Sequence, residues 1–168
     1  MFTKLWQGFE QFRRLGLVDG PPPRLYGGQG AGCSPVAHAF AEGTQVMPIR
    51  PNTIAHSLAI GNPADGDLAV ATARTSGGAV YAVPEEDIGP NIAWLAETTG
   101  VFGETAPSVT VGALRAAVEH GEVGADDRVV VLVTATGLKT PQAVPARSSV
   151  IEIEPNADAV LARSRVAA

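Results

Sequence analysis

Residues 129–133 read Val-Val-Val-Leu-Val, an unbroken apolar run that leads directly into Thr134 and, three residues later, a glycine turn. A continuous run of this kind indicates a strand that is buried on both faces, as strands are in parallel sheets covered by helices. Ligands of open α/β sheets collect outside the carboxyl ends of such strands. We therefore predict an α/β fold with Thr134 at a position where ligands bind.

The rest of the chain alternates between helical and strand-like segments, which favours a three-layer fold with a mostly parallel sheet and helices on both faces. Helix-capping and helix-breaking residues indicate where the helices begin and end. Ser34 and Pro35 indicate the start of one helix, and Gly43 indicates its end. We expect helices at 3–15, 35–42, 67–78, 84–100, 106–121 and 156–164, a helix-like segment at 53–60, and strands within 24–30, 79–83, 127–134 and 149–155.

The composition limits the partners and the compartment. A chain of 168 residues with 45% hydrophobic and 17% charged residues is typical of one globular domain. Its net charge is -5 and no basic cluster exceeds Arg13-Arg14, which argues against nucleic acid and anionic membranes as partners. Cys33 has no second cysteine to pair with, and neither a signal-like start nor a long apolar run is present, so we expect a cytoplasmic protein.

Isolated nucleophiles and bases offer no catalytic constellation on their own. Cys33 has no paired histidine and acid at a sensible spacing, so we expect a small buried thiol. Lone histidines are more often structural or solvated than catalytic, and we assign no role and no metal to His38, His56 or His120.

Four stretches, in unbroken order from Thr3 to Pro141, together resemble the C-terminal half of a threonine synthase, a pyridoxal-phosphate enzyme of the tryptophan-synthase β-like fold (fold type II). They read TKLWQGFEQFRRLGLV...PRLYGGQGAGCSP, TIAHSLAIGNPADG, TSGGAVYAVPEEDI and VFGETAPSVTVGAL...GLKTP. The resemblance implies that residues 1–168 form a single C-terminal half of the large, cofactor-binding domain. It also implies pyridoxal 5'-phosphate as the cofactor.

The resemblance assigns cofactor-binding roles to three places in this sequence. Thr134 matches the hydroxyl residue that shares a hydrogen bond with the pyridine nitrogen, and Glu104 matches a glutamate that begins a helix near the ring. A glycine loop that passes one face of the cofactor is matched by Gly61, Asn62, Pro63 and Ala64. On the residues alone, Thr134 is a residue at a strand end and the loop is an ordinary turn.

The sequence also departs from the family pattern. Thr105 stands where the family has a proline, Pro107 stands in place of its serine, and Thr75 stands where a glutamate is common. The stretch TATGLKT replaces the more usual Thr-Gly-His-Gly-Leu-Lys-Asp. These differences put the contribution of Ser108 and the choice of substrate in doubt.

Two elements that the family requires are not found in this sequence: a Schiff-base lysine in its usual context and the glycine-rich phosphate loop that precedes the first helix. The lysines here are Lys4 and Lys139, and neither matches that context. We therefore expect no catalytic residue in this chain and an N-terminal-half polypeptide that supplies both elements, so that the enzyme is split and inactive without its partner. A higher-order oligomer is expected as well.

The expected activity is that of a lyase in amino-acid metabolism, catalysing β- or γ-replacement or elimination on an O-phosphohomoserine-like substrate. Two alternatives stay open. The chain could be a non-catalytic scaffold or regulatory relic that binds a related enzyme, or a piece of a longer enzyme.

Overall fold

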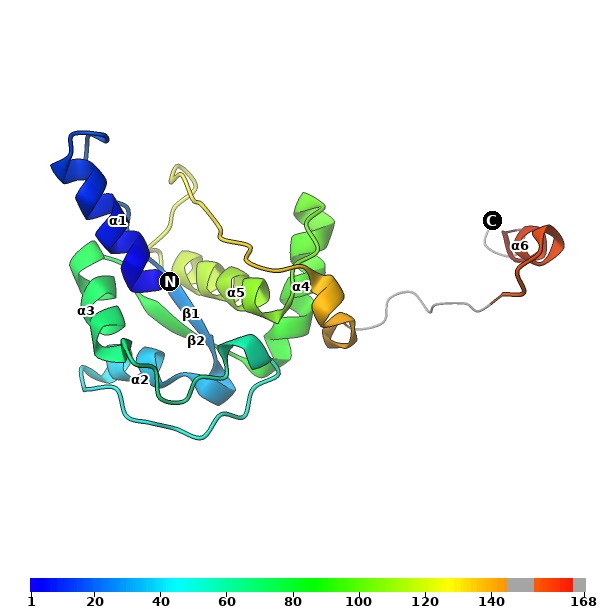
Figure 1. Ribbon diagram of the computed structural model, residues 1–168, viewed down its shortest axis with the longest axis horizontal. Helices are drawn as coiled ribbons and strands as arrows, with labels where there is room; N and C mark the ends of the chain where they lie inside the picture. The colour runs from blue at the N-terminus through cyan, green and yellow to red at the C-terminus, as the bar shows by residue number, and fades with distance from the viewer. Residues whose placement is uncertain (145–152, 165–168) are drawn as a thin grey trace.

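The structure is a computed structural model that describes residues 1–144 and 153–164 (Figure 1). Six α-helices, two strands and four short 3-10 helices follow one another in these residues. They are α1 (Phe2–Arg14), β1 (Gly27–Gly30), η1 (Ala31–Cys33), α2 (Pro35–Glu42), η2 (His56–Leu58), α3 (Gly66–Ser76), β2 (Val80–Val83), α4 (Glu85–Thr99), α5 (Thr105–Glu119), η3 (Gly137–Lys139), η4 (Pro141–Ala143) and α6 (Ala157–Ser164).

The two strands form a parallel pair at the centre of the fold. Gly27 pairs with Val80 and Gly30 pairs with Val83, so the strands are in register along their whole length. The strand expected within 24–30 is confirmed, but it comprises only the Gly-Gly-Gln-Gly part. A β-carbon on Gly28 would lie 2.7 Å from the carbonyl oxygen of Val109, so glycine at this position lets α5 pack directly on the strand.

Helices cover both faces of this pair. Val80 packs in one core cluster with residues of α2 and α3, among them Val36 and Val70. Val83 packs in a second cluster with Ile88 of α4 and Val109 of α5. Because side chains along a strand alternate between faces, residues 80 and 83 anchor opposite layers. The expected α/β fold, with helices on both faces of a parallel sheet, is confirmed.

The helices begin and end at the capping and helix-breaking residues that the sequence indicates. Helix α2 begins at Pro35 directly after Ser34 and ends before Gly43, whose φ of 72° only glycine adopts readily. Helices α3 and α4 end in the same way at Gly77 and Gly100. All six long helices expected from the sequence are present, with ends within a few residues of the expected ones. No helix in the described ranges is both long and apolar enough to cross a membrane.

The helix expected at 53–60 is mostly wrong, since only η2 forms there. The reason lies in a side chain distant in sequence. The Glu85 carboxylate accepts hydrogen bonds from the Ile54 N–H at 2.9 Å and from the Thr53 hydroxyl at 3.0 Å. These bonds hold the start of the segment in a non-helical conformation.

The strand expected at 127–134 is also wrong for the described structure. Residues 128–134 form no strand, and Val130 is 85% exposed. A buried strand needs neighbours on both edges and cover on both faces, and β1 and β2 pair only with each other. The strand expected at 149–155 lies mostly outside the described residues, and its last part, residues 153–155, has no strand conformation.

Candidate functional site

Glu104 is a buried carboxylate at the start of α5. The residue is 6% exposed, and it is the N-cap of the helix, as the family resemblance implies. Its Oε1 accepts a hydrogen bond from the Ser57 hydroxyl of η2 at 3.3 Å. A buried charge needs such polar partners, and the positive end of the helix dipole adds to its stabilisation.

The stretch after Thr134 is joined to the same place. The Glu104 N–H donates to the carbonyl of Ala135 at 3.1 Å, and Thr136 forms an isolated antiparallel bridge with Gly103. Thr134, the residue immediately before Ala135, is exposed. The structure thus brings the chain around Thr134 next to Glu104, although these residues lie thirty positions apart.

The loop at 61–64 packs against the chain around Ile49. A β-carbon on Gly61 would lie 1.9 Å from the carbonyl oxygen of Ile49, and the Ile49 N–H donates to the Gly61 carbonyl at 2.9 Å. The close approach that this glycine permits is therefore to the protein's own backbone. No hydrogen bond or ion pair in the described residues joins the loop to Glu104 or Thr134. The segment just upstream of the loop does contact α5, through the Ser57 hydrogen bond to Glu104 and through the packing of Ala55 and Leu58 against Val109.

The loop also lines a surface cavity of about 270 Å³ at the start of α3. Asn62, Pro63 and Ala64 line it together with Asp65 and Asp67. Both carboxylates are engaged in fixing the neighbouring chain. Asp65 accepts from the buried Thr3 hydroxyl at 2.9 Å, and Asp67 accepts from the N–H of Val46 at 2.8 Å.

Glu85 is a residue that sequence reasoning missed. Besides its bonds to residues 53 and 54, its carboxylate accepts from the N–H of Gly32 at 3.0 Å. It therefore ties the turn after β1 to the segment that leads to Ser57. In the sequence, Glu85 is only the first of the acidic residues of a helix start, and nothing there indicates these distant contacts.

Two further residues from the sequence analysis, Cys33 and Ser108, are buried. Cys33 is fully buried, as expected. Burial raises the pKa of its thiol, and the charge of Glu85 raises it further, so the thiol stays protonated. Ser108, whose contribution was in doubt, is also fully buried, and its hydroxyl donates to the carbonyl of Ile88. Its contact is with α4 and is structural.

Thr105, which stands in place of the family proline, is buried like Ser108 but lacks a hydrogen-bond partner in the described structure. Its side chain is 1% exposed, and its hydroxyl oxygen has no hydrogen-bond partner among the described residues. A buried hydroxyl without a partner is costly. It marks a place beside Glu104 where a further polar group would be stabilising. No cluster of three or more metal-ligating side chains occurs in the described ranges.

Comparison with known proteins identifies the family to which the chain belongs. The family model for pyridoxal-phosphate dependent enzymes matches residues 1–135. The threonine synthase of Methanocaldococcus jannaschii is 34% identical over 155 residues, which cover 90% of this chain and 38% of that protein. The threonine synthase of Methanosarcina acetivorans is 34% identical over 84% of this chain and 35% of that protein. That of Synechocystis is 37% identical over 83% and 34%.

This chain therefore spans little more than a third of the length of the relatives that it matches. The family match nevertheless includes both cores, all of α1 to α5 and the stretch up to Ala135. On these grounds, the chain belongs to the family of pyridoxal-phosphate dependent enzymes.

Proposed function

We propose that this chain, together with a separate N-terminal-half polypeptide, forms a pyridoxal-phosphate-dependent lyase of the threonine synthase type. The observation that carries the proposal is the junction at Glu104. There, η2, the start of α5 and the stretch that follows Thr134 are held together by the Ser57 hydroxyl and the Ala135 carbonyl.

The residues at this junction suit one side of a pyridine-ring site. Glu104 supplies a buried carboxylate, and Thr134 supplies an exposed hydroxyl. The unpartnered hydroxyl of Thr105 provides a further hydrogen-bonding group beside them. In the proposed site, Thr134 holds the ring nitrogen, while Glu104 and the loop at 61–64 border the ring.

When bound, pyridoxal phosphate withdraws electrons from the amino-acid substrate, and the protein sets the strength of that effect. Thr134 would contribute a neutral hydroxyl, which cannot hold the ring nitrogen protonated as a carboxylate would. Ser57 fixes the orientation of the Glu104 carboxylate through its 3.3 Å hydrogen bond. In this proposal, Thr134 tunes the electron withdrawal by the ring and Ser57 orients the Glu104 carboxylate. Neither residue acts as a nucleophile.

The partner is proposed to supply the Schiff-base lysine, the phosphate loop and the smaller substrate-binding domain. Neither lysine of this chain fits the lysine's role, since Lys4 donates to Gln7 on the exposed surface of α1 and Lys139 lies exposed in η3. An exposed aromatic stripe on α1 also favours a partner, because large apolar patches mark interaction sites. Its aromatic members are Phe9 and Phe12, and the exposed Leu15, which caps the helix, continues the apolar surface.

The proposed reaction is β- or γ-replacement or elimination on an amino acid with an O-phosphohomoserine-like side chain. The relatives are named threonine synthases, which supports a reaction that yields an amino acid. Thr75, Thr105 and Thr136 differ from the residues common in the family, so a related amino-acid substrate fits equally well.

Co-expression with a candidate N-terminal half tests the proposal. We expect the two chains to elute together in size-exclusion chromatography with cofactor absorbance at the complex peak. This chain alone is expected to develop no such absorbance with pyridoxal phosphate. A well-folded monomer that ignores every candidate half would reject the split enzyme and leave the scaffold role in its place.

A further inference from the structure

The apolar segment, which we define as residues 129–133, pairs with no strand that the structure describes. No main-chain hydrogen bond within the described part of the chain involves residues 128–134. Val129 is 47% exposed, Val130 85% and Leu132 40%. Figure 1 shows the segment as part of the long yellow trace between the end of α5 and η3. An exposed run of valines and leucine, in which most residues are β-branched and the main-chain groups are unpaired within the described structure, is a template for pairing with another strand.

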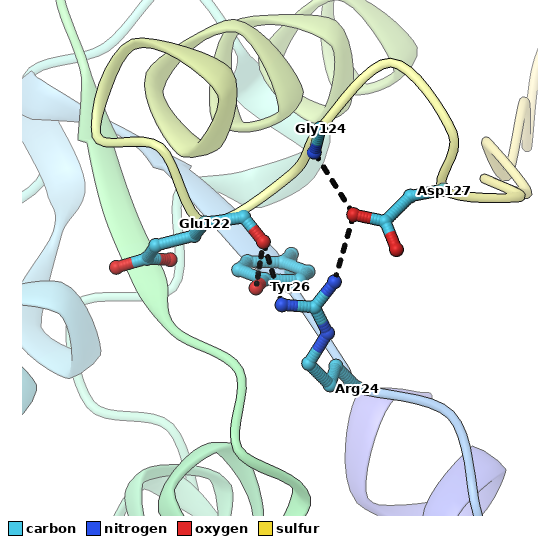
Figure 2. Close-up of polar contacts among 5 residues, drawn as sticks. All are labelled: Arg24, Tyr26, Glu122, Gly124 and Asp127. Atoms are coloured by element: carbon cyan, nitrogen blue, oxygen red, sulfur yellow. Dashed lines mark hydrogen bonds and ion pairs between the residues drawn. The ribbon is translucent and has the colours of Figure 1, made fainter.

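The beginning of this segment is fixed by Arg24, which precedes β1 (Figure 2). The guanidinium donates from Nη2 to Oδ2 of Asp127 at 3.0 Å and from Nη1 to the carbonyl of Glu122 at 2.6 Å. The same Asp127 oxygen accepts from the Gly124 N–H at 2.9 Å, and the Tyr26 hydroxyl donates to the Glu122 carbonyl at 3.4 Å. The loop before the apolar segment is therefore tied to the start of the sheet.

The end of the segment is fixed as well. The Ala135 carbonyl accepts from Glu104, and the Gly137 N–H donates to the Phe102 carbonyl at 2.9 Å. Both anchors are in place without any strand partner, so residues 128–134 are held between two fixed points. A segment held in this way loses little further conformational freedom when a strand pairs with it, which favours strand addition.

We propose that the apolar segment is a docking edge that receives a β-strand of the polypeptide carrying the remainder of the family domain. This proposal rests on the proposed function for the existence of that polypeptide. The segment lies inside the family match, which extends to residue 135, yet β1 and β2 leave it unpaired. The relatives carry about three fifths of their length outside the matched region, and the missing neighbour belongs to that part.

Docking would also act on the site. Thr134 directly follows the apolar segment, and its backbone would continue the new ladder. Pairing at Val133 would thus fix the hydroxyl that is proposed to hold the ring nitrogen. Assembly and cofactor binding would be coupled through this one segment, and the isolated chain would hold Thr134 in place only through Ala135.

Two substitutions at Val130 test the docking edge. Val130→Lys places a charge in the proposed interface, and Val130→Pro removes the N–H that a ladder would use. Val118→Lys, on the exposed side of α5, is the matched control because Val118 is 52% exposed. The tagged full-length chain and its variants are purified from the source organism, and co-eluting polypeptides are sequenced by mass spectrometry.

With the unsubstituted chain, we expect a co-eluting polypeptide that matches the pyridoxal-phosphate enzyme family outside the region matched here. Each Val130 variant should retain about tenfold less of it, which corresponds to a loss of about 1.4 kcal/mol. The Val118 control should retain a normal amount. Circular dichroism of the isolated variants should be unchanged, because the Val130 side chain is exposed and its N–H is unpaired among the described residues.

Each contrary outcome has a distinct meaning. If both Val130 variants retain the partner, the docking edge is wrong and the proposed function stands. If no family polypeptide co-elutes, both the docking edge and the split enzyme are wrong. Dimerisation of this chain that the Val130 substitutions abolish would assign the edge to a second copy and overturn the proposal. Unfolding of the isolated chain by either variant would show that the edge is not free.

Discussion

The hydroxyl of Ser57 donates a hydrogen bond to the carboxylate of Glu104 at 3.3 Å. The two residues belong to elements that are far apart in the sequence, η2 and the start of α5. This contact is the only side-chain hydrogen bond in the described residues that joins the 53–64 region to Glu104. It adds a polar link to the packing of Ala55 and Leu58 against Val109 of α5, which also holds the two parts of the candidate site together.

Replacement of Ser57 by alanine should alter the site more than the fold. The side chain of Ser57 is exposed, so we expect a stability loss of about 0.5–1.5 kcal/mol, the usual contribution of one hydrogen bond. In the assembled enzyme, cofactor affinity should fall because the Glu104 carboxylate loses its orientation. Urea unfolding of the chain and cofactor titration of the complex measure the two effects. Ser57→Thr, which retains the hydroxyl, should restore the affinity, and its failure to do so would reject the role of this bond.

Glu85 should matter for stability far more than its position at a helix start suggests. Its carboxylate accepts three hydrogen bonds, from Gly32, Thr53 and Ile54. We expect Glu85→Ala to cost at least about 2 kcal/mol, since hydrogen bonds to charged groups contribute about 1.5–3 kcal/mol each. Glu85→Gln should recover only part of this, because its amide NH₂ would face N–H or O–H donors.

Chemical denaturation of both variants measures these losses. Glu86→Ala is the matched control, since Glu86 is an exposed neighbour on the same helix turn. Equal stabilities for the Glu85→Ala and Glu86→Ala variants would show that the three hydrogen bonds contribute nothing in solution.

The glycines offer a matched pair of alanine substitutions. A β-carbon at Gly28 would lie 2.7 Å from the Val109 carbonyl oxygen, whereas one at Gly8 meets nothing within 4 Å. Gly28→Ala should therefore destabilise the chain by about 1–3 kcal/mol through overpacking between β1 and α5. Gly8→Ala, inside α1, should stabilise it by about 0.5–1 kcal/mol. Thermal unfolding distinguishes the two directions, and a tolerated Gly28→Ala would contradict the close packing of α5 on the sheet.

Acid should loosen the anchor at Arg24. The Gly124 N–H, followed by the Arg24 guanidinium, lowers the pKa of Asp127 in the folded chain. Because this pKa lies below its unfolded value, the stabilisation is fully present above the unfolded pKa and is lost as the pH falls through the folded one. We expect the melting temperatures of the parent chain and of Asp127→Asn to converge below about pH 4. A difference that is constant across pH would exclude this carboxylate as the cause.

The sequence predicts helices here better than strands. Helices α2, α3 and α4 end at glycines that can be read directly, since a positive φ is a local requirement. The apolar segment gave the wrong expectation because burial depends on what lies beside a strand, and the described neighbours of residues 129–133 leave it exposed. Within the site, the start of α5 at Glu104 was predictable from the family pattern. The contacts of Glu85 were not, because they join residues more than thirty positions apart.

Thr134→Val tests the residue on which the site proposal depends most. Valine keeps nearly the same volume and removes the hydroxyl. Thr134 is exposed and its hydroxyl has no hydrogen bond to any described residue, so the stability of the isolated chain should change by less than about 0.5 kcal/mol. In the assembled enzyme, the lost hydrogen bond to the ring should shift the cofactor absorbance and lower turnover. Thr134→Ser, which keeps the hydroxyl, should behave like the parent chain. An unchanged spectrum and unchanged turnover in Thr134→Val would remove Thr134 from the cofactor site, whatever the outcome of the docking experiment.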